Sequence, residues 1–479
     1  MLFGFLFTRE LPDTRLVIDT STSPSVAPRL AAHRRGEAPW LLRAVAVTVF
    51  VFPANIIFDP LGANGFVAMV LALILVGVWV ASALWGLHDP VIQRHPARLG
   101  LGILWLVTVA SFVAMGGGPA TVQGKLSAER WVITLLAITG IVCVTADFVR
   151  TREQLASLVR ALVLGATFCA AVGIYQFFLH TDPVHYWTDL MVGMTDNGGR
   201  TTFQQRSQFV RVAGTTFTPI ELGVVMVMVF PLAVWRCIYD PSRRRWVAWA
   251  QCLVILAAAV FTVSRSMILS LLAVTIVMVP FLPVVARRWA YILVPTGVVA
   301  VFALVPGMVA TMLATITITT TSNDPSITTR LNNYPRVEAM VHDRPLLGSG
   351  PGTYLPVNAL KILDNEYLKV AVEMGLLGVF ALIAFLVLPT YAAFFAACNL
   401  RDPAMKALAG GVAGAGLASV LVSATFDSLS FPTFTIVFAF VAGLSGSVWL
   451  VARNQPEESE IDLESDQYRT KGTERESIS

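Results

Sequence analysis

The sequence is poor in charged residues and in cysteine. Only 13% of its 479 residues are Asp, Glu, Lys or Arg, about half of the ~25% that is typical of soluble globular domains. A water-soluble protein is therefore excluded. The five cysteines are widely spaced, lie in or beside apolar runs and form no CxxC pair, so we expect neither a disulfide framework nor a zinc site.

Common catalytic and nucleotide-binding motifs are missing as well. The sequence contains no glycine-rich nucleotide loop, no set of metal ligands and no Ser/His/Asp arrangement, so we expect neither a metal nor a cofactor. The net charge is +4, but the arginines cluster in short loops between apolar runs. That placement is typical of membrane topology, and we expect no nucleic-acid partner.

Long apolar runs dominate the sequence, and 56% of its residues are hydrophobic. Each long run suffices to cross a hydrocarbon layer of about 30 Å as a helix. We predict an all-α, polytopic membrane bundle of about twelve transmembrane helices in contact with membrane lipid. They are expected near Trp40–Phe58, Gly62–Trp85, Leu99–Met115, Trp131–Phe148, Leu155–Leu179, Ile220–Ile238, Trp246–Val263, Met267–Val285, Trp289–Met312, Tyr367–Phe395, Ala404–Ala424 and Pro432–Val451.

Lysine and arginine in alternate short loops predict the orientation, because cytoplasmic loops are enriched in these residues. A cytoplasmic N-terminus puts every basic short loop on the cytoplasmic side. These loops carry Arg94, Arg98, Arg150, Arg152, Arg236, Arg243, Arg244, Arg245, Arg287, Arg288, Arg401, Lys406 and Arg453.

Two segments without a predicted span flank the transmembrane domain, which we place at residues 40–453. Residues 1–39 are predicted to be a flexible cytoplasmic N-terminus. Residues 454–479 are rich in acidic side chains and cannot bury enough apolar surface to order themselves. We expect them to form a disordered cytoplasmic tail.

Two extracytoplasmic segments are longer than turns, His180–Phe217 and the large loop at residues 313–365. Loops of such length inside a compact protein are usually functional. The second contains a stretch with helical character, Thr328–His342, after a β-branched run, Ile316–Thr321. We predict a small helical cap over the extracytoplasmic face.

Ser264-Arg265-Ser266 joins two apolar runs whose other ends carry basic clusters. Arg265 is therefore expected at the outer tip of a tight turn. One interpretation is an arginine that snorkels to the membrane interface. The other is an anion clamp, because guanidinium binds phosphate oxygens in a bidentate manner and stays charged.

Arg211 lies at the end of the first long loop, and Glu221 lies within the apolar run that follows. A carboxylate at mid-depth in a membrane helix costs about 2.5 kcal/mol or more, so Glu221 should face protein or water. It is either a structural partner of an arginine or a direct participant in the chemistry.

Asp364 and Asn365 open the tenth predicted span and are good helix N-caps. Glu366, Lys369 and Glu373 follow at helical spacing, which places them on one face of the helix. A polar stripe that runs into the bundle predicts a wet cavity open to the outside.

The candidate residues therefore share one membrane face. A diphosphate held by guanidinium groups, with a carboxylate to orient or deprotonate a hydroxyl, fits this set. The candidate catalytic residues are Asp364, Arg265 and Arg211, and the candidate substrate-binding residues are Arg330, Arg336, Arg344, Asn365, Tyr367, Lys369, Glu373 and Glu221.

These motifs resemble those of the O-antigen ligase and O-antigen polymerase superfamily of bacterial envelope enzymes. The resemblance covers roughly Leu155–Val451 and depends on the order of the motifs. They are Arg211-Val-Ala-Gly-Thr-Thr-Phe, Ser264-Arg265, Arg330 ahead of Arg344-Pro-Leu-Leu-Gly-Ser-Gly-Pro-Gly352, and Asp364-Asn-Glu-Tyr-Leu with Glu373-Met-Gly-Leu-Leu-Gly.

The resemblance implies a glycosyltransferase in the bacterial cytoplasmic membrane. It would move a glycan from an undecaprenyl-diphosphate carrier to a hydroxyl of a glycan or glycolipid acceptor, without metal, at the extracytoplasmic face. Such a reaction serves the synthesis of O-antigen, exopolysaccharide or another envelope polymer. Arg211 and Arg265 would hold the diphosphate.

In the ligases of this family a histidine before the Asn-x-Tyr-Leu segment is the proposed base, and Asp364 occupies that position here. A carboxylate close to arginines is a weaker base than imidazole at neutral pH. Asp364 is therefore a base, an orienting group or the partner of an arginine, and His342 is an alternative base. The missing histidine favours a polymerase, or a ligase with an acceptor other than lipopolysaccharide.

Two other functions are compatible with the sequence. A transporter or flippase for an anionic solute would also need charged residues, but transporters usually place them near the bilayer midplane and often show internal repeats. A different glycosyltransferase, which uses a polyprenyl-phosphate monosaccharide, would need an acid in the first outer loop. Asp59 lies there, although an Asp-Pro turn often has a purely structural role.

Overall fold

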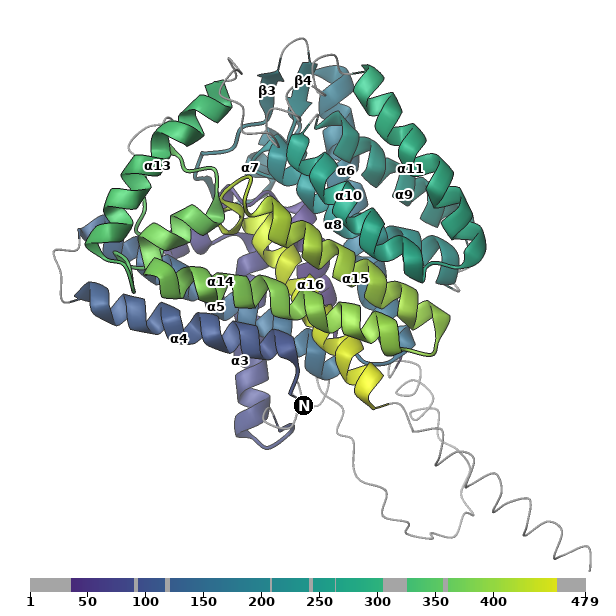
Figure 1. The fold of residues 1–479 in the computed structure, drawn as a ribbon, viewed down its shortest axis with the longest axis horizontal. Helices are drawn as coiled ribbons and strands as arrows, with labels where there is room; N and C mark the ends of the chain where they lie inside the picture. The colour runs from purple at the N-terminus through teal and green to yellow at the C-terminus, as the bar shows by residue number, and fades with distance from the viewer. Residues whose placement is uncertain are drawn as a thin grey trace, which may run out of the picture.

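The described part of the chain is built almost entirely from helices. The computed structural model describes residues 36–89, 94–116, 121–206, 209–240, 244–262, 264–304, 325–355 and 361–454. Its longer helices are α2 (Trp40–Val51), α3 (Val67–Leu84), α4 (Pro96–Gly116), α5 (Val122–Phe148), α6 (Arg152–Leu179), α8 (Pro219–Tyr239), α9 (Arg245–Phe261), α10 (Arg265–Met278), α11 (Val284–Leu304), α13 (Pro325–Asp343), α14 (Glu366–Asn399), α15 (Pro403–Val422) and α16 (Pro432–Arg453) (Figure 1). Within the described residues, eight helices are long and apolar enough to cross a membrane. The predicted all-α, polytopic membrane bundle is confirmed.

Each predicted span overlaps one of these helices, and the differences lie at the boundaries. The first helix ends at Val51 instead of Phe58, because Pro53 lacks the amide hydrogen that a helix interior requires. The cap helix predicted over Thr328–His342 is present as α13. The predictions for residues 1–35, 305–324 and 455–479 fall outside the described residues.

Short strands and helices lie in the loops between the long helices. β1 (Ile56–Ile57) pairs antiparallel with β2 (Thr195–Asp196), and β3 (Phe203–Arg206) pairs antiparallel with β4 (Phe209–Val212). The remaining short elements are α7 (His185–Leu190), η2 (Asp59–Asn64), η3 (Val279–Phe281) and η5 (Ser428–Ser430). The first long loop is thus folded onto the bundle.

Polar side chains start several of the helices. The side chains of Thr121, Thr151, Thr218, Asn365 and Asp402 each accept a hydrogen bond from a backbone amide in the first turn of the helix that follows. These amides have no partner within the helix, so the caps satisfy groups that would otherwise need water. The starting points of α5, α6, α8, α14 and α15 can therefore be explained from local sequence.

Helix α16 is the most buried of the eight candidate spans, because 89% of its 18-residue apolar stretch is buried inside the protein. It crosses the middle of the bundle in Figure 1. It packs against α5 and α14, and α14 also packs against α4 and α15. Small residues allow the close approach of α15 to α14, because a Cβ atom at Gly416 would lie only 2.4 Å from Thr390 Oγ1. Such small-residue contacts are typical of membrane helix pairs.

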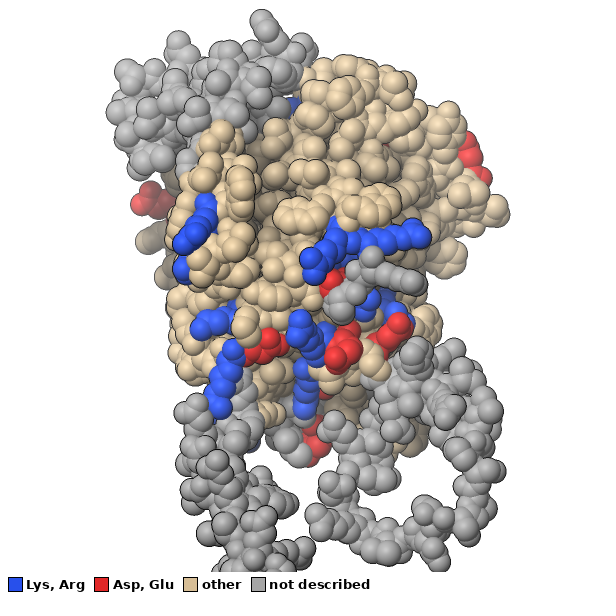
Figure 2. Space-filling view, turned by 90° about the vertical axis from the view of Figure 1, so that its right-hand side faces the viewer, with Lys and Arg blue, Asp and Glu red and all other residues tan. Residues whose placement is uncertain are grey.

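The two ends of the bundle are formed by different elements. Arg152 contacts the Tyr239 carbonyl and Asp402, so the start of α6, the end of α8 and the start of α15 lie together at what we call the basic end. Charged side chains gather across the lower part of the face in Figure 2, below a broad area that shows few charged side chains. The opposite end, here called the loop end, carries α13 and the β3–β4 hairpin (Figure 1).

Candidate functional site

Arg211 is held in place by the β3–β4 hairpin and by the turn before α10. It lies on β4 opposite Gln204, and only 7% of its surface is exposed. Its Nε atom donates to the Thr262 carbonyl at 2.7 Å, and its Nη1 atom donates to Gln204 Oε1 at 3.4 Å. Arg211 is therefore attached to the segment that leads directly into Arg265.

Arg265 is the first residue of α10 and is partly buried, with Ser264 as the N-cap residue. The next residue, Ser266, shares a 2.8 Å hydrogen bond with Thr425 in the loop between α15 and α16. A helix N-terminus attracts anions, because its amides and its dipole are positive. With Arg211 and Arg265 beside it, the start of α10 is suited to bind a phosphate group.

Glu221 is fully buried in α8, and its carboxylate accepts hydrogen bonds from three backbone amides. One carboxylate oxygen accepts from Phe217 N, and the other accepts from Thr433 N and Phe434 N at 2.9 and 3.1 Å. The carboxylate thus satisfies the first amides of α16, which lies more than 200 residues further along the chain. We assign Glu221 a structural role at this helix start.

The loop between α15 and α16, residues 423–431, connects the arginines with α14. The Ser423 carbonyl accepts from Glu366 N at 2.8 Å, and Glu366 Oε2 accepts from Leu429 N at 3.0 Å. The same loop holds Thr425, the partner of Ser266. The starts of α10, α14 and α16 therefore meet at one loop.

A polar cavity of about 280 Å³ lies beside this loop. Lys369 and Glu373, two members of the predicted polar stripe, both line it. Lys369 Nζ donates to Ser430 Oγ at 2.5 Å and lies 3.8 Å from a Glu366 oxygen. The full lining is Gly352, Tyr354, Leu355, Ile362, Leu363, Lys369, Glu373, Asp427 and Ser430.

Glu373 fixes one wall of this cavity. Its oxygens accept from Gly352 N and Tyr354 N at 3.1 and 3.2 Å, so they are occupied by the Gly/Pro-rich turn that begins at Arg344. The turn fits because α14 is interrupted at Gly375, which has φ 66°. A Cβ atom there would lie 2.4 Å from the Leu346 carbonyl oxygen, so only glycine allows this approach.

The residues at the start of α14 lie in different environments. Asp364 adopts a left-handed conformation with φ 46° and is partly buried outside the helix. Asn365 caps α14 through a hydrogen bond from Leu368 N at 3.2 Å. Tyr367 donates its hydroxyl to the Val420 carbonyl at 2.8 Å, so it ties α14 to α15.

The arginines of the cap are dispersed. The Arg336 guanidinium lies 5.6 Å from the centre of the Tyr354 ring, at cation–π distance, and Tyr354 lines the cavity. Arg344 and the alternative base His342 are exposed. Arg330 lies on α13, but its side chain is outside the described part of the structure. Arg336 is thus the cap arginine that the structure places beside the cavity.

Sequence reasoning missed Asp427, Ser430 and Tyr354. Asp427 lines the cavity, and its side chain does not cap the short helix that it precedes. Burial raises the pKa of Tyr354, so its hydroxyl keeps the proton that it donates to the Lys361 carbonyl. The sequence feature that could have indicated Asp427 and Ser430 is Asp427-Ser-Leu-Ser430, a short polar stretch between two apolar runs on the predicted extracytoplasmic face.

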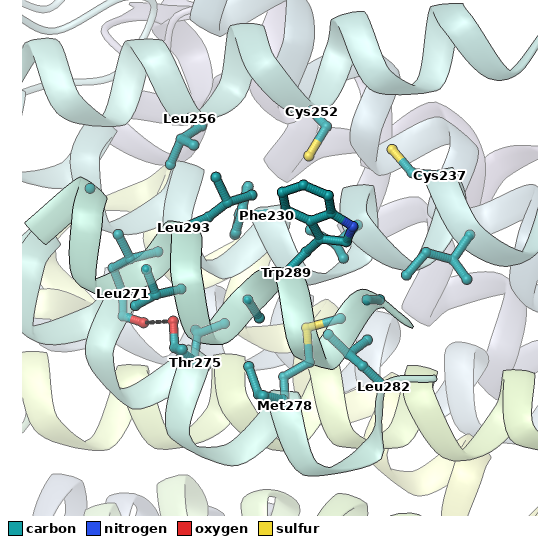
Figure 3. A pocket seen from close by; sticks show the side chains of 18 of the residues that line it. Phe230, Cys237, Cys252, Leu256, Leu271, Thr275, Met278, Leu282, Trp289 and Leu293 are labelled. Carbon is teal, nitrogen blue, oxygen red and sulfur yellow. Dashed lines mark hydrogen bonds between the residues drawn. The ribbon is translucent and has the colours of Figure 1, made fainter. Parts of the chain in front are cut away.

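A second, apolar cavity lies between α8, α9, α10 and α11 and has a volume of about 830 Å³ (Figure 3). On α10 its lining begins at Met267, two residues after Arg265, and continues to Met278. Side chains from the neighbouring helices, among them Phe230, Leu256, Trp289 and Leu293, close its sides. We call it the apolar groove.

Comparison with curated proteins finds no match. Residues 250–383 match the family model described as O-antigen ligase. The matched segment contains Arg265, Asp364, Lys369 and Glu373, together with the described parts of α13, whereas Arg211 precedes it. This match to the family model confirms that the membrane protein is similar to the O-antigen ligase and O-antigen polymerase superfamily.

Proposed function

We propose that this protein is a membrane glycosyltransferase of the O-antigen ligase or polymerase type. Its donor is a glycan linked to undecaprenyl diphosphate, and its acceptor is a hydroxyl of a glycan or glycolipid. The reaction takes place at the extracytoplasmic face of the bacterial cytoplasmic membrane and contributes to an envelope or exported polysaccharide. The family match supports glycan transfer in general, and the following features support the more specific assignment.

The distribution of residues along α10 carries the proposal. Arg265 stands at the start of this helix, and Arg211 binds the turn that precedes it. From Met267 to Met278 the same helix lines the apolar groove. A ligand that fits both regions has a negatively charged head and a long apolar chain, which are the two parts of a polyprenyl diphosphate.

The polar cavity supplies the acceptor side of the reaction. Glu373 and Glu366 are occupied by backbone amides and by Lys369, whereas Asp427 is not used to cap its helix. We assign Asp427 as the carboxylate that receives the acceptor proton. Asp364, at the start of α14, then orients the acceptor or pairs with an arginine.

In the proposed reaction the acceptor oxygen attacks the anomeric carbon of the donor glycan. The bond between that carbon and the diphosphate oxygen breaks, and the electron pair leaves with undecaprenyl diphosphate. The hydroxyl proton moves to the carboxylate. Arg211 and Arg265 stabilise the charge that develops on the departing diphosphate, as fixed cations do in other transfer reactions.

The positive-inside rule supports the orientation, because the basic end carries the arginines of the short loops. Arg152, Arg236, Arg245 and Arg453 lie at helix ends on this side. The loop end, with Arg211, Arg265 and the polar cavity, then faces outward. A glycan that has already crossed the membrane on its lipid carrier reaches the site from that side.

Reconstitution tests the proposed function. The full-length protein in liposomes is given an undecaprenyl-diphosphate-linked glycan and an acceptor glycan, and we expect a longer glycan and free undecaprenyl diphosphate. Arg288→Ala, an exposed arginine at the basic end, is the matched control for Arg265→Ala. Uptake of a labelled anionic solute without any glycan transfer would instead identify a transporter.

The envelope glycan profile of a deletion strain distinguishes the two enzyme types. Loss of long chains with short units still attached is expected for a polymerase. Accumulation of unattached lipid-linked polymer is expected for a ligase. An unchanged profile would contradict both.

A further inference from the structure

A second arginine of the first long loop, Arg200, is buried in the loop itself. Its side chain is only 7% exposed. Nη1 donates to Asp182 Oδ2 at 2.6 Å, Nε donates to the Thr216 carbonyl at 3.1 Å, and Nη2 donates to the Gly214 carbonyl. All three guanidinium nitrogens are thus directed at the protein.

Gln176 of α6 completes this arrangement from below the loop. Its side-chain oxygen accepts from Gly214 N at 2.7 Å, and its Nε2 atom donates to the Gly214 carbonyl at 3.0 Å and to Asp182 Oδ1 at 2.9 Å. Gln176 is completely buried. Both backbone groups of Gly214 are therefore bound by side chains.

Asp182 is the ionised centre of the network. Burial by itself would raise its pKa, but the Arg200 charge and the hydrogen bonds from Arg200, Thr202 and Val184 lower the pKa below its ordinary value. Thr202 donates to Asp182 Oδ2 at 2.7 Å. The ion pair with Arg200 therefore persists at neutral pH.

The network ends three residues from Arg211. Gly214 has φ 59°, and a Cβ atom there would lie 2.8 Å from the Cys169 carbonyl oxygen. Its position thus depends on close contact with α6. Beyond it, Phe217 is held by Glu221 and pairs with Thr201. The segment from Gly214 to Phe217, which follows Arg211, is therefore fixed by hydrogen bonds at both of its ends.

We infer that Arg200 is a positioning residue for Arg211: through Asp182, Gln176 and Gly214 it fixes the strand from which Arg211 reaches the diphosphate, without itself touching the ligand. The inference rests on the proposed function, because it assumes that Arg211 binds a diphosphate. It also assigns different roles to two arginines that lie 11 residues apart in the same loop.

Lysine cannot replace arginine in this position. The planar guanidinium binds Asp182 and two carbonyls simultaneously, whereas an ammonium group on a flexible chain cannot hold the same three acceptors in this geometry. Arg200→Lys therefore keeps the charge in the loop but loosens the Gly214 segment. A ligand that used Arg200 only for its charge would tolerate this substitution.

The test measures binding of farnesyl diphosphate to the purified full-length protein, with farnesol as the uncharged comparison. We expect Arg200→Lys to weaken diphosphate binding about tenfold, an effect within the range of coupled residues. In an Arg211→Ala background, Arg200→Lys should cause no further loss. Arg130→Lys, at an exposed arginine on α5 that belongs to neither candidate set, should bind like the wild type.

Thr202→Val is the milder variant if Arg200→Lys does not yield folded protein. It removes one hydrogen bond to Asp182 and should weaken diphosphate binding about threefold, again only when Arg211 is present. Melting temperatures of all variants in detergent show whether a loss of binding reflects a loss of folded protein.

Three results would overturn the inference. Unchanged binding in Arg200→Lys and in Thr202→Val would show that the network does not position Arg211. A full further loss in the Arg211→Ala background would show that Arg200 contacts the ligand itself. Wild-type protein that does not distinguish farnesyl diphosphate from farnesol would remove the proposed donor class and this inference together, whereas the first two results leave the donor class intact.

Discussion

The hydroxyl oxygens of Ser266 and Thr425 lie 2.8 Å apart, although 159 residues separate them in the sequence. Ser266 follows Arg265 at the start of α10, and Thr425 lies two residues before Asp427. This hydrogen bond joins the turn that carries the proposed diphosphate clamp to the loop that carries the proposed base. The two halves of the site are therefore held at a defined spacing by the protein.

Replacement of Arg265 by alanine should lower the rate of glycan transfer by about 100-fold or more, the usual effect of removing one fixed group that stabilises a developing negative charge. Arg265→Lys should recover little, because a single ammonium group does not bind two phosphate oxygens in a bidentate manner. Transfer rates in liposomes at equal protein content measure the effect. Full activity of Arg265→Ala would exclude the clamp.

Two carboxylates compete for the role of base, and their amide variants separate them. Asp427→Asn should lower the transfer rate by about 100-fold or more, because an amide cannot accept the acceptor proton. Asp364→Asn should have a smaller effect if Asp364 only orients the acceptor. The pair is compared in the same transfer assay, with melting temperatures as the control for folding. The reverse order of effects would assign proton transfer to Asp364, and Asp364→His would then test whether imidazole restores the ligase type of base.

Glu221→Ala should destabilise the protein. The substitution leaves the amides of Phe217, Thr433 and Phe434 without their buried acceptor, at a cost of about 3 kcal/mol or more. Glu221→Gln keeps one oxygen acceptor and should be affected less. Thermal unfolding in detergent measures both, with Glu338→Ala, an exposed acid on α13, as the control. An unchanged melting temperature of Glu221→Ala would mean that water replaces the carboxylate at the start of α16.

The membrane spans were predictable because a helix that crosses a bilayer requires about 20 consecutive apolar residues. The cap helix α13 was predictable from its local pattern as well. Gly375 was not recognised as a break, because an isolated glycine within an apolar run is compatible with a continuous helix. Its left-handed conformation depends on the turn at Leu346, which reaches α14 only in the folded protein.

The polar residues of the site were harder to interpret for the same reason. The helical spacing of Lys369 and Glu373, which is a local property, predicted a polar stripe on one helix face, and both residues line the polar cavity. Glu221 binds amides more than 200 residues away. Asp427 lines the cavity because the loop between α15 and α16 packs beside α14 in the folded protein. Local sequence shows that such charges need partners but does not identify the partners.

The apolar groove leads to the last prediction. Leu271 lines it on α10, and tryptophan at this position would fill part of the space. Each buried methylene contributes about 0.8 kcal/mol, so exclusion of a few isoprenoid carbons should raise KM for an undecaprenyl-linked donor about tenfold or more. A donor with a short isoprenoid chain, which ends before Leu271, should keep its KM, and kcat should change little because the arginines and carboxylates are untouched. Leu106→Trp, on an exposed apolar face of α4, is the control for a bulky residue elsewhere in the bundle. An equal effect of Leu271→Trp on the long and short donors would mean that the lipid chain does not lie along α10.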